Sequence, residues 1–196
     1  EIGYKFQSSN FFADFDGGFA WEGSSINGFK NNDYYPYAHL NSRWSINDKN
    51  NLSLWFQYAT NSPGITALAS DVLSVNEFIY KTGNPDLKNS RHITLDLSYF
   101  RSFSDNIYLS ANGSFYELLK RPAEEYLPYN GGRQLIRRVI NSGNFYQGNI
   151  NAELNVFLFN KMVLLRCAPA LSFYKTTGIN AKDLTTPSLL LSLIHI

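Results

Sequence analysis

Apolar and polar residues alternate along much of the chain with a period of two, which predicts β-strands with unlike faces. The alternation is clear in residues 91–101. From residue 92 to residue 99 the odd-numbered positions are apolar, with Ile93, Leu95, Leu97 and Tyr99, and the even-numbered positions are polar, with His92, Thr94, Asp96 and Ser98. A turn at residues 102–105 reverses the chain, and residues 106–119 alternate in the same way. Both arms of this hairpin have the length with which a tilted strand crosses a bilayer.

The same alternation predicts strands on both sides of this hairpin: residues 2–8, 37–46, 52–58, 146–158 and 163–174, with shorter segments at 78–81 and 134–141. The connections are alternately long and short: 11–33, 61–90 and 121–143 are long, and 47–51, 102–105 and 160–161 are short. Outer-membrane barrels have this topology, because their periplasmic turns are short and their extracellular loops are long. The predicted fold class is therefore all-β, an antiparallel transmembrane β-barrel of which this chain holds an incomplete portion of about eight strands.

The parities also predict which side chains face lipid and which face the lumen. We expect the apolar parity to face lipid, at Leu95, Leu97, Leu154 and Val156, and the polar parity to face the lumen, at Asp96, Glu153 and Asn155. Aromatic residues flank the short turns, Trp44 and Trp55 at one and Tyr99, Phe100 and Phe103 at another. Such rings fit an interfacial belt, and ordinary packing at strand ends is the alternative interpretation.

A loop motif precedes the strand at residues 91–101. Residues 83–88 read Gly-Asn-Pro-Asp-Leu-Lys, and this motif ahead of a long alternating strand resembles the barrel of TonB-dependent outer-membrane receptors of the Bacteroidetes type. That family usually has Pro directly after the Lys, where this chain has Asn89. The resemblance extends over roughly residues 2–180.

The resemblance implies active uptake of a scarce or bulky solute, such as a siderophore or a glycan, at the bacterial cell outer membrane. The partners that it implies are outer-membrane lipid, an extracellular solute of unknown identity, and the TonB system through a plug domain upstream of Glu1. We expect ligand contacts from aromatic residues of the long connections, because rings combined with hydrogen-bonding groups suit sugars and chelates. These residues are Trp21, Phe29, Tyr34, Tyr35, Tyr126 and Tyr129.

Composition narrows the function classes further. Of the 196 residues, 44% are hydrophobic, 17% charged and 16% aromatic, a mixture that favours strands and amphipathic surfaces. The formal net charge of +1 gives no reason to expect a nucleic-acid partner. A single cysteine, Cys167, cannot form an internal disulfide or a metal cage.

The two ends of the sequence give separate expectations. Residues 1–6 read as the middle of a strand and carry no signal peptide, so we expect the chain to begin inside a longer protein. Residues 189–196 lack polar alternation and the terminal aromatic residue with which such barrels usually end. The expected organisation is a partial outer-membrane barrel domain at 1–188 and a non-native or truncated tail at 189–196.

No catalytic or cofactor motif stands out in the sequence. There is no Gly-x-Ser-x-Gly, Walker A or Gly-x-Gly-x-x-Gly pattern. The histidines, His39, His92 and His195, lack metal-ligand spacing. Carboxylates at Asp14, Asp16, Glu124 and Glu125 fall in predicted loops, where they are usually solvated. We therefore expect no enzyme activity, no cofactor and no metal site.

Two other function classes compete with the receptor. One is a complete small outer-membrane barrel that serves as an anchor or adhesin, which predicts a signal peptide and a closing aromatic end. The other is a soluble carbohydrate-binding β-sandwich, which predicts short connections throughout and conflicts with the long run 61–90.

Overall fold

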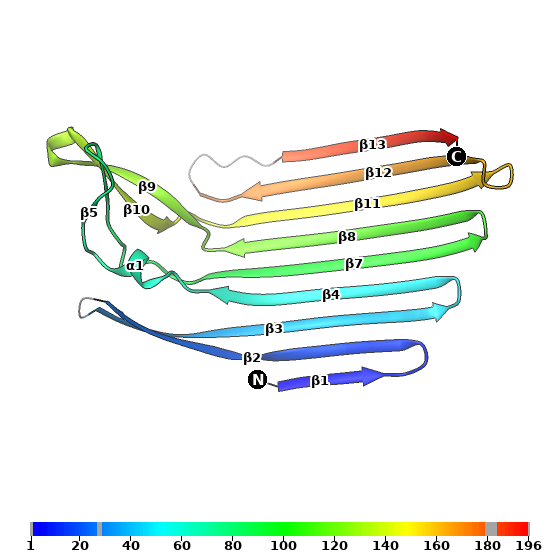
Figure 1. Cartoon of the computed structure of the whole chain (residues 1–196), viewed down its shortest axis with the longest axis horizontal. Helices are drawn as coiled ribbons and strands as arrows, with labels where there is room; N and C mark the ends of the chain where they lie inside the picture. The colour runs from blue at the N-terminus through cyan, green and yellow to red at the C-terminus, as the bar shows by residue number, and fades with distance from the viewer. Residues whose placement is uncertain (1, 27–28, 179–183, 196) are drawn as a thin grey trace.

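Most of the chain forms one large antiparallel β-sheet (Figure 1). The structure is a computed structural model that describes residues 2–26, 29–178 and 184–195. Within these residues the large sheet has nine strands. In spatial order they are β1 (Ile2–Gln7), β2 (Phe11–Ile26), β3 (Phe29–Asn47), β4 (Asn50–Asn61), β7 (Ser90–Ser104), β8 (Ile107–Leu119), β11 (Phe145–Leu158), β12 (Val163–Thr176) and β13 (Leu184–His195).

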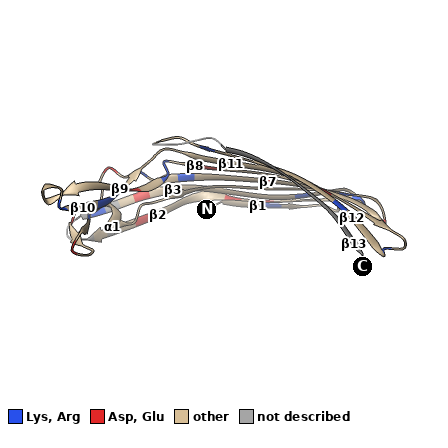
Figure 2. Cartoon of the chain, turned by 90° about the horizontal axis from the view of Figure 1, so that it is seen from above, with Lys and Arg blue, Asp and Glu red and all other residues tan. Residues whose placement is uncertain are grey.

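The large sheet is a single curved layer, seen along its edge in Figure 2. Strands β1 and β13 lie at its two edges, and within the described ranges they do not pair with each other, so the sheet is not closed there. The accessible surface is 12895 Å² for a chain of 22.3 kDa, whereas a compact monomer of that mass exposes about 9,400 Å². A β-sandwich, which needs two sheets packed face to face, does not describe this arrangement.

The two faces of the large sheet differ as the alternation predicts. The register brings apolar residues of adjacent strands side by side in one row: Tyr4, Phe15, Leu40, Phe56, Leu95 and Phe115. Residues of this face remain exposed, with Leu97 at 46% and Ile150 at 59%. Soluble monomers rarely expose apolar patches of such extent, so this face requires an apolar environment.

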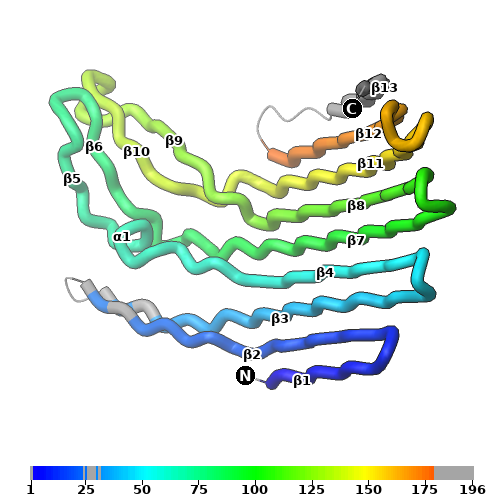
Figure 3. Tube along the Cα trace, turned by 45° about the vertical axis from the view of Figure 1, so that its right-hand side comes forward, coloured from blue at the N-terminus to red at the C-terminus, as the bar shows by residue number. Residues whose placement is uncertain are grey.

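A second sheet, which we call the loop sheet, is built from two of the long connections. It contains β5 (Leu73–Ser74), β6 (Ile79–Lys81), β9 (Pro122–Tyr129) and β10 (Gln134–Asn141), accompanied by the short helices α1 (Ile65–Leu68) and η1 (Asn130–Gly132). Strand β10 pairs antiparallel with β9 and parallel with β6. The loop sheet extends beyond the end of the large sheet and does not cover its face (Figures 1 and 3).

Three sequence expectations about connections are corrected by the structure. The expected loop 11–33 is instead the hairpin of β2 and β3, because its glycines and asparagines hide an alternation that continues to Ile26. The connections 61–90 and 121–143 were expected to be separate, and the structure joins strands from both of them in the loop sheet. Residues 134–141 do form a strand, yet it belongs to the loop sheet, and the large sheet resumes only at Phe145.

The C-terminal segment forms a strand that the sequence pattern did not predict. No strand was expected beyond residue 188, whereas Leu184–His195 pairs with β12 along its whole length. The run of leucines lacks polar alternation, so the pattern that reveals the other strands is absent here. Ile196 lies outside the described residues.

The short turns lie together at one end of the large sheet, and the loop sheet lies at the other (Figure 1). This sidedness agrees with the predicted alternation of short and long connections. No helix among the described residues is long and apolar enough to span a membrane.

Candidate ligand-binding face

The second face of the large sheet, which we call the polar face, carries small polar side chains in cross-strand rows. One row includes, on the six adjacent strands from β3 to β12, Asn41, Trp55, Asp96, Ser114, Asn149 and Ser172. Asn149 Nδ2 donates a hydrogen bond to Ser114 Oγ at 3.1 Å, and Asn112 Nδ2 donates one to Asn151 Oδ1 at 3.0 Å. These cross-strand bonds orient amide groups on an open polar surface.

Most charged residues of the polar face occur in ion pairs between neighbouring strands. Lys5 Nζ lies 3.3 Å from Asp14 Oδ2, and His39 Nδ1 lies 3.0 Å from Asp16 Oδ1. Arg166 pairs with Glu153 between β12 and β11. Asp14 and Asp16 were expected to be solvated loop carboxylates, and the structure places both in strand β2 with partners.

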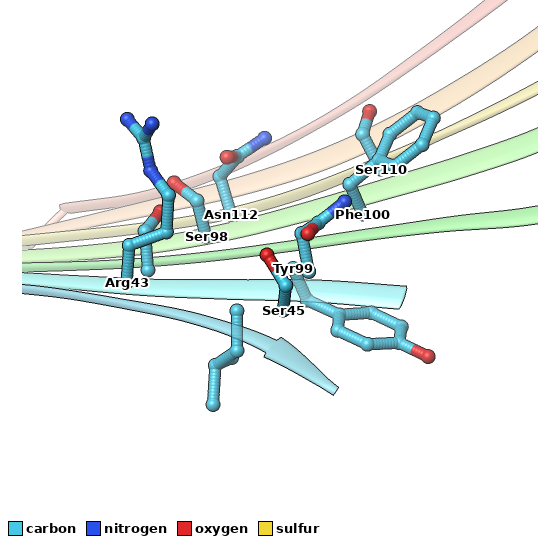
Figure 4. A pocket seen from close by; sticks show the side chains of 10 residues that line it. Arg43, Ser45, Ser98, Tyr99, Phe100, Ser110 and Asn112 are labelled. Atoms are coloured by element: carbon cyan, nitrogen blue, oxygen red, sulfur yellow. The ribbon is translucent and has the colours of Figure 1, made fainter. Parts of the chain in front are cut away.

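A hollow of about 440 Å³ lies between the small side chains of the polar face, in the half of the sheet nearer the short turns. Figure 4 shows Arg43, Ser98 and Asn112 standing on one side of the sheet, with Tyr99 on the other. Arg43 also borders a second hollow of about 270 Å³. The polar face therefore has open space beside hydrogen-bonding groups.

Two aromatic groups stand on the polar face at opposite ends of the strands. The first, which we call the rim ladder, lies at the end near the loop sheet and comprises His92, Tyr116, Phe145 and Tyr174. The second, which we call the turn cluster, lies near the short turns and comprises Phe100, Tyr108 and Phe157. Neither group is apparent in the sequence, because the members of each come from different strands and meet only through the register.

The predicted ligand contacts of the first long connection lie on the β2–β3 hairpin. Trp21 and Tyr34 are directly opposite each other and are 62% and 66% exposed. Tyr35 is buried, and its hydroxyl donates a hydrogen bond to Glu22 Oε2 at 3.2 Å. Burial raises the pKa of the Tyr35 phenol, and the Glu22 carboxylate raises it further. The backbone of Phe29 begins β3, and its side chain lies outside the described residues.

The remaining predicted contacts, Tyr126 and Tyr129, lie on β9 of the loop sheet. The Tyr126 hydroxyl donates a hydrogen bond to Glu124 Oε2 at 2.9 Å, and the Tyr129 ring lies 5.0 Å from the Tyr80 ring. Among the described side chains, no hydrogen bond or ring contact joins these tyrosines to Trp21, Tyr34 or Tyr35. The structure thus divides the candidates between two elements.

The Gly-Asn-Pro-Asp-Leu-Lys motif connects the loop sheet to the large sheet. Gly83 N donates a hydrogen bond to Ala69 O at 2.9 Å, and Asn84 Nδ2 donates one to Val139 O at 3.0 Å. A Cβ atom on Gly83 would lie 2.0 Å from Ala69 O, so the motif needs glycine here. Leu87, together with Leu68 and Ala69, is among the few buried apolar residues described.

Asn141 completes this junction from the other long connection. Its Oδ1 accepts a hydrogen bond from Lys88 N at 2.8 Å, and its Nδ2 donates to Lys88 O at 3.0 Å and Lys120 O at 2.9 Å. The motif therefore has a structural role, since it holds two long connections together where they leave the large sheet.

The acidic pair on β9 is engaged by arginines on β10. Glu124 Oε1 lies 3.1 Å from Arg137 Nη1, and Glu125 Oε2 lies 2.7 Å from Arg138 Nε. These carboxylates were expected to be solvated, and the structure pairs them across the β9–β10 hairpin. The described part of the chain contains no cluster of three or more His, Cys, Asp or Glu side chains suited to a metal ion.

The expected aromatic belt is divided between the two faces. Trp44 lies on the apolar face beside Phe11 and Leu52, and it is 45% exposed. Trp55 lies on the polar face, with its ring 5.8 Å from the His39 ring. Trp44 has the position of an interfacial ring, whereas Trp55 does not.

Comparison with known proteins supports the interpretation of the fold. No protein-family model matches the chain, and no curated protein matches it in sequence. A solved structure, the outer membrane transporter YddB from Escherichia coli, is similar over 98% of this chain at 12% identity, with a TM-score of 0.51. The fold is that of an outer-membrane β-barrel wall. The chain spans 38% of the length of that transporter.

The two faces of this sheet differ in what they offer to their surroundings. One face suits contact with lipid, and the other offers amides, hydroxyls and exposed rings beside open space. A bound ligand would find its hydrogen-bonding groups on the polar face, and the loop sheet lies at the end opposite the short turns (Figure 1).

Proposed function

We propose that the chain forms part of the barrel wall of a TonB-dependent receptor that takes up a bulky or scarce solute through the bacterial outer membrane. The observation that carries this proposal is the nine-stranded sheet with one exposed apolar face and one polar face, together with its likeness to an outer membrane transporter. In this function the apolar face contacts outer-membrane lipid and the polar face lines the lumen. A plug domain elsewhere in the protein links the receptor to TonB, and the barrel wall performs no enzymatic step.

The sidedness of the long connections supports capture from outside the cell. The loop sheet and the β2–β3 hairpin lie at the end opposite the short turns, and both present aromatic side chains. Cysteine at Arg133, in the loop sheet, should react with a membrane-impermeant maleimide on intact cells. Cysteine at Lys49 or Asp105, in the short turns, should react only after the outer membrane is opened, and the reverse pattern would overturn this orientation.

Uptake measurements test the proposed function directly. Strains with and without the chromosomal gene for this protein are given fluorescently labelled neutral oligosaccharides or ferric siderophores, each in a background with or without TonB. We expect gene-dependent uptake of at least one probe, and its loss without TonB. Uptake that depends on the gene but not on TonB would contradict the receptor assignment, and no gene-dependent uptake would favour a structural anchor.

A further inference from the structure

The rim ladder is a continuous series of aromatic contacts across four strands of the polar face. Ring centroids are 6.5 Å apart for His92 and Tyr116, 6.2 Å for Tyr116 and Phe145, and 6.4 Å for Phe145 and Tyr174. The rings come in turn from β7, β8, β11 and β12. The ladder therefore runs across the strands of the large sheet, at the end of the sheet that adjoins the loop sheet (Figure 1).

These rings do not pack into a protein core. All four are half-buried, and the large sheet is a single layer that leaves the polar face uncovered. Cross-strand aromatic pairs stabilise a sheet by about 0.2–1 kcal/mol each. This stabilisation accounts for a single aromatic pair more readily than for a series of four rings. A ring on a hydrated surface also offers a flat apolar area that a ligand can cover.

Unused hydrogen-bonding groups lie beside the rings. The register places Gln147 directly between Tyr116 and Tyr174, and Thr94 directly opposite Tyr116. Within the described residues, the Gln147 amide and the hydroxyls of Tyr116 and Tyr174 make no hydrogen bond to protein. They are available to a ligand that lies on the rings.

The chemistry of the ladder favours an uncharged ligand. From β4 to β12 its two cross-strand rows contain, besides the four aromatic residues, only Gln57, Ala59, Thr94, Leu118, Gln147 and Thr176. None of these side chains carries a charge with which to bind a carboxylate, a phosphate or an anionic chelate. Flat apolar surfaces bordered by amides and hydroxyls match a pyranose ring, which has C–H faces and hydroxyl edges.

We propose that the rim ladder is a binding track for a neutral oligosaccharide, whose sugar rings stack on Tyr116, Phe145 and Tyr174 and hydrogen-bond to Gln147. This inference rests on the proposed function, because it treats the polar face as the lumen of a receptor. The inference names glycans as the solute among those that such a receptor could take up. It also names the residues of the barrel wall that would bind them.

The test uses the full-length protein, produced from its chromosomal gene and purified in detergent. Binding of malto-, cello-, xylo- and manno-oligosaccharides is measured by calorimetry beside ferric citrate, an anionic chelate. We expect one neutral series to bind and Tyr116→Ala and Tyr174→Ala each to weaken it by roughly three- to tenfold. Tyr116→Phe should lose less affinity than Tyr116→Ala, because it keeps the ring.

Tyr108→Ala is the matched control, since it removes a ring of the turn cluster on the same face and should leave affinity unchanged. A heat-modifiable band on gels checks that every variant assembles.

Equal sugar affinity in the wild-type protein and both ladder variants would overturn the rim ladder as a binding track, and it would leave the proposed TonB-dependent uptake unaffected. Binding of ferric citrate alone, or of none of these probes, would overturn the neutral-oligosaccharide assignment. Sugar binding that depends on the ladder, with uptake that does not need TonB, would overturn the receptor function and leave the binding track intact.

Discussion

The large sheet and the loop sheet differ in how their strands find partners. In the large sheet nearly every strand pairs with its neighbours along the chain through a repeated antiparallel register, and its two faces follow the alternation of residues. In the loop sheet β6 and β10 come from different connections and pair in parallel, and single side chains hold the sheet at its base. Face polarity therefore governs the wall, whereas a few specific contacts govern the loops. Substitutions should therefore affect the two regions separately.

The largest effect is expected from a charge on the apolar face of the wall. Leu95→Arg should lower the free energy of unfolding by roughly 2–4 kcal/mol if the residue lies near the bilayer midplane, because arginine is costly in lipid. Asp96→Lys, one residue away on the polar face, is the matched control and should have little effect. Urea unfolding of the full-length protein in lipid vesicles measures both, and equal losses would contradict the assignment of faces.

A methyl group at Gly83 should disturb the loop sheet and spare the wall. Its Cβ would meet the Ala69 carbonyl oxygen at 2.0 Å, so Gly83→Ala must shift the motif, at a cost of about 1–3 kcal/mol. Gly64→Ala, in the same connection with open space around it, is the control. Limited proteolysis on intact cells should cut the Gly83→Ala loops faster while the barrel stays heat-modifiable. Equal cutting of both variants would show that the close approach at Gly83 is unimportant.

Asn141→Ala should loosen the junction between the two long connections. It removes the hydrogen bonds to Lys88 and Lys120, with an expected cost of about 1–3 kcal/mol if the Lys88 groups remain unsatisfied. Hydrogen exchange at the Lys88 amide should become faster, while amides in the middle of β7 and β8 keep their protection. An unchanged exchange rate at the Lys88 amide would mean that water takes over the hydrogen bonds of Asn141 without loss of stability.

The smallest effect is expected from the ion pairs of the β9–β10 hairpin. Arg138 and Glu125 are partly exposed, so their coupling should be only about 0.2–1 kcal/mol and should fall as salt is added. A double-mutant cycle with Arg138→Ala and Glu125→Ala, followed by proteolysis of the loop sheet, measures it. A coupling much larger than this would mean that the hairpin is held by charge more than by its strand pairing.

The sequence by itself determined most of the wall, but not β2 and β13. Strands such as β7, β8, β11 and β12, and the assignment of Leu95 and Asp96 to opposite faces, follow from a period of two, which is a local property of consecutive residues. The pattern failed where the local signal is weak, in the glycine-rich β2 and the leucine-rich β13. The motif at residues 83–88 was visible in the sequence, but its contacts were not.

Only the tertiary structure decided which distant residues meet. The parallel pairing of Leu135 with Ile79, the bonds of Asn141 to Lys88, and the contact of Tyr116 with Phe145 join segments that no local pattern relates. The register of the large sheet brings the four rings of the rim ladder together, and a shift of one residue would send each ring to the other face. Periodicity therefore fixes the face on which a side chain stands, while strand pairing fixes its neighbours, and a binding site depends on both.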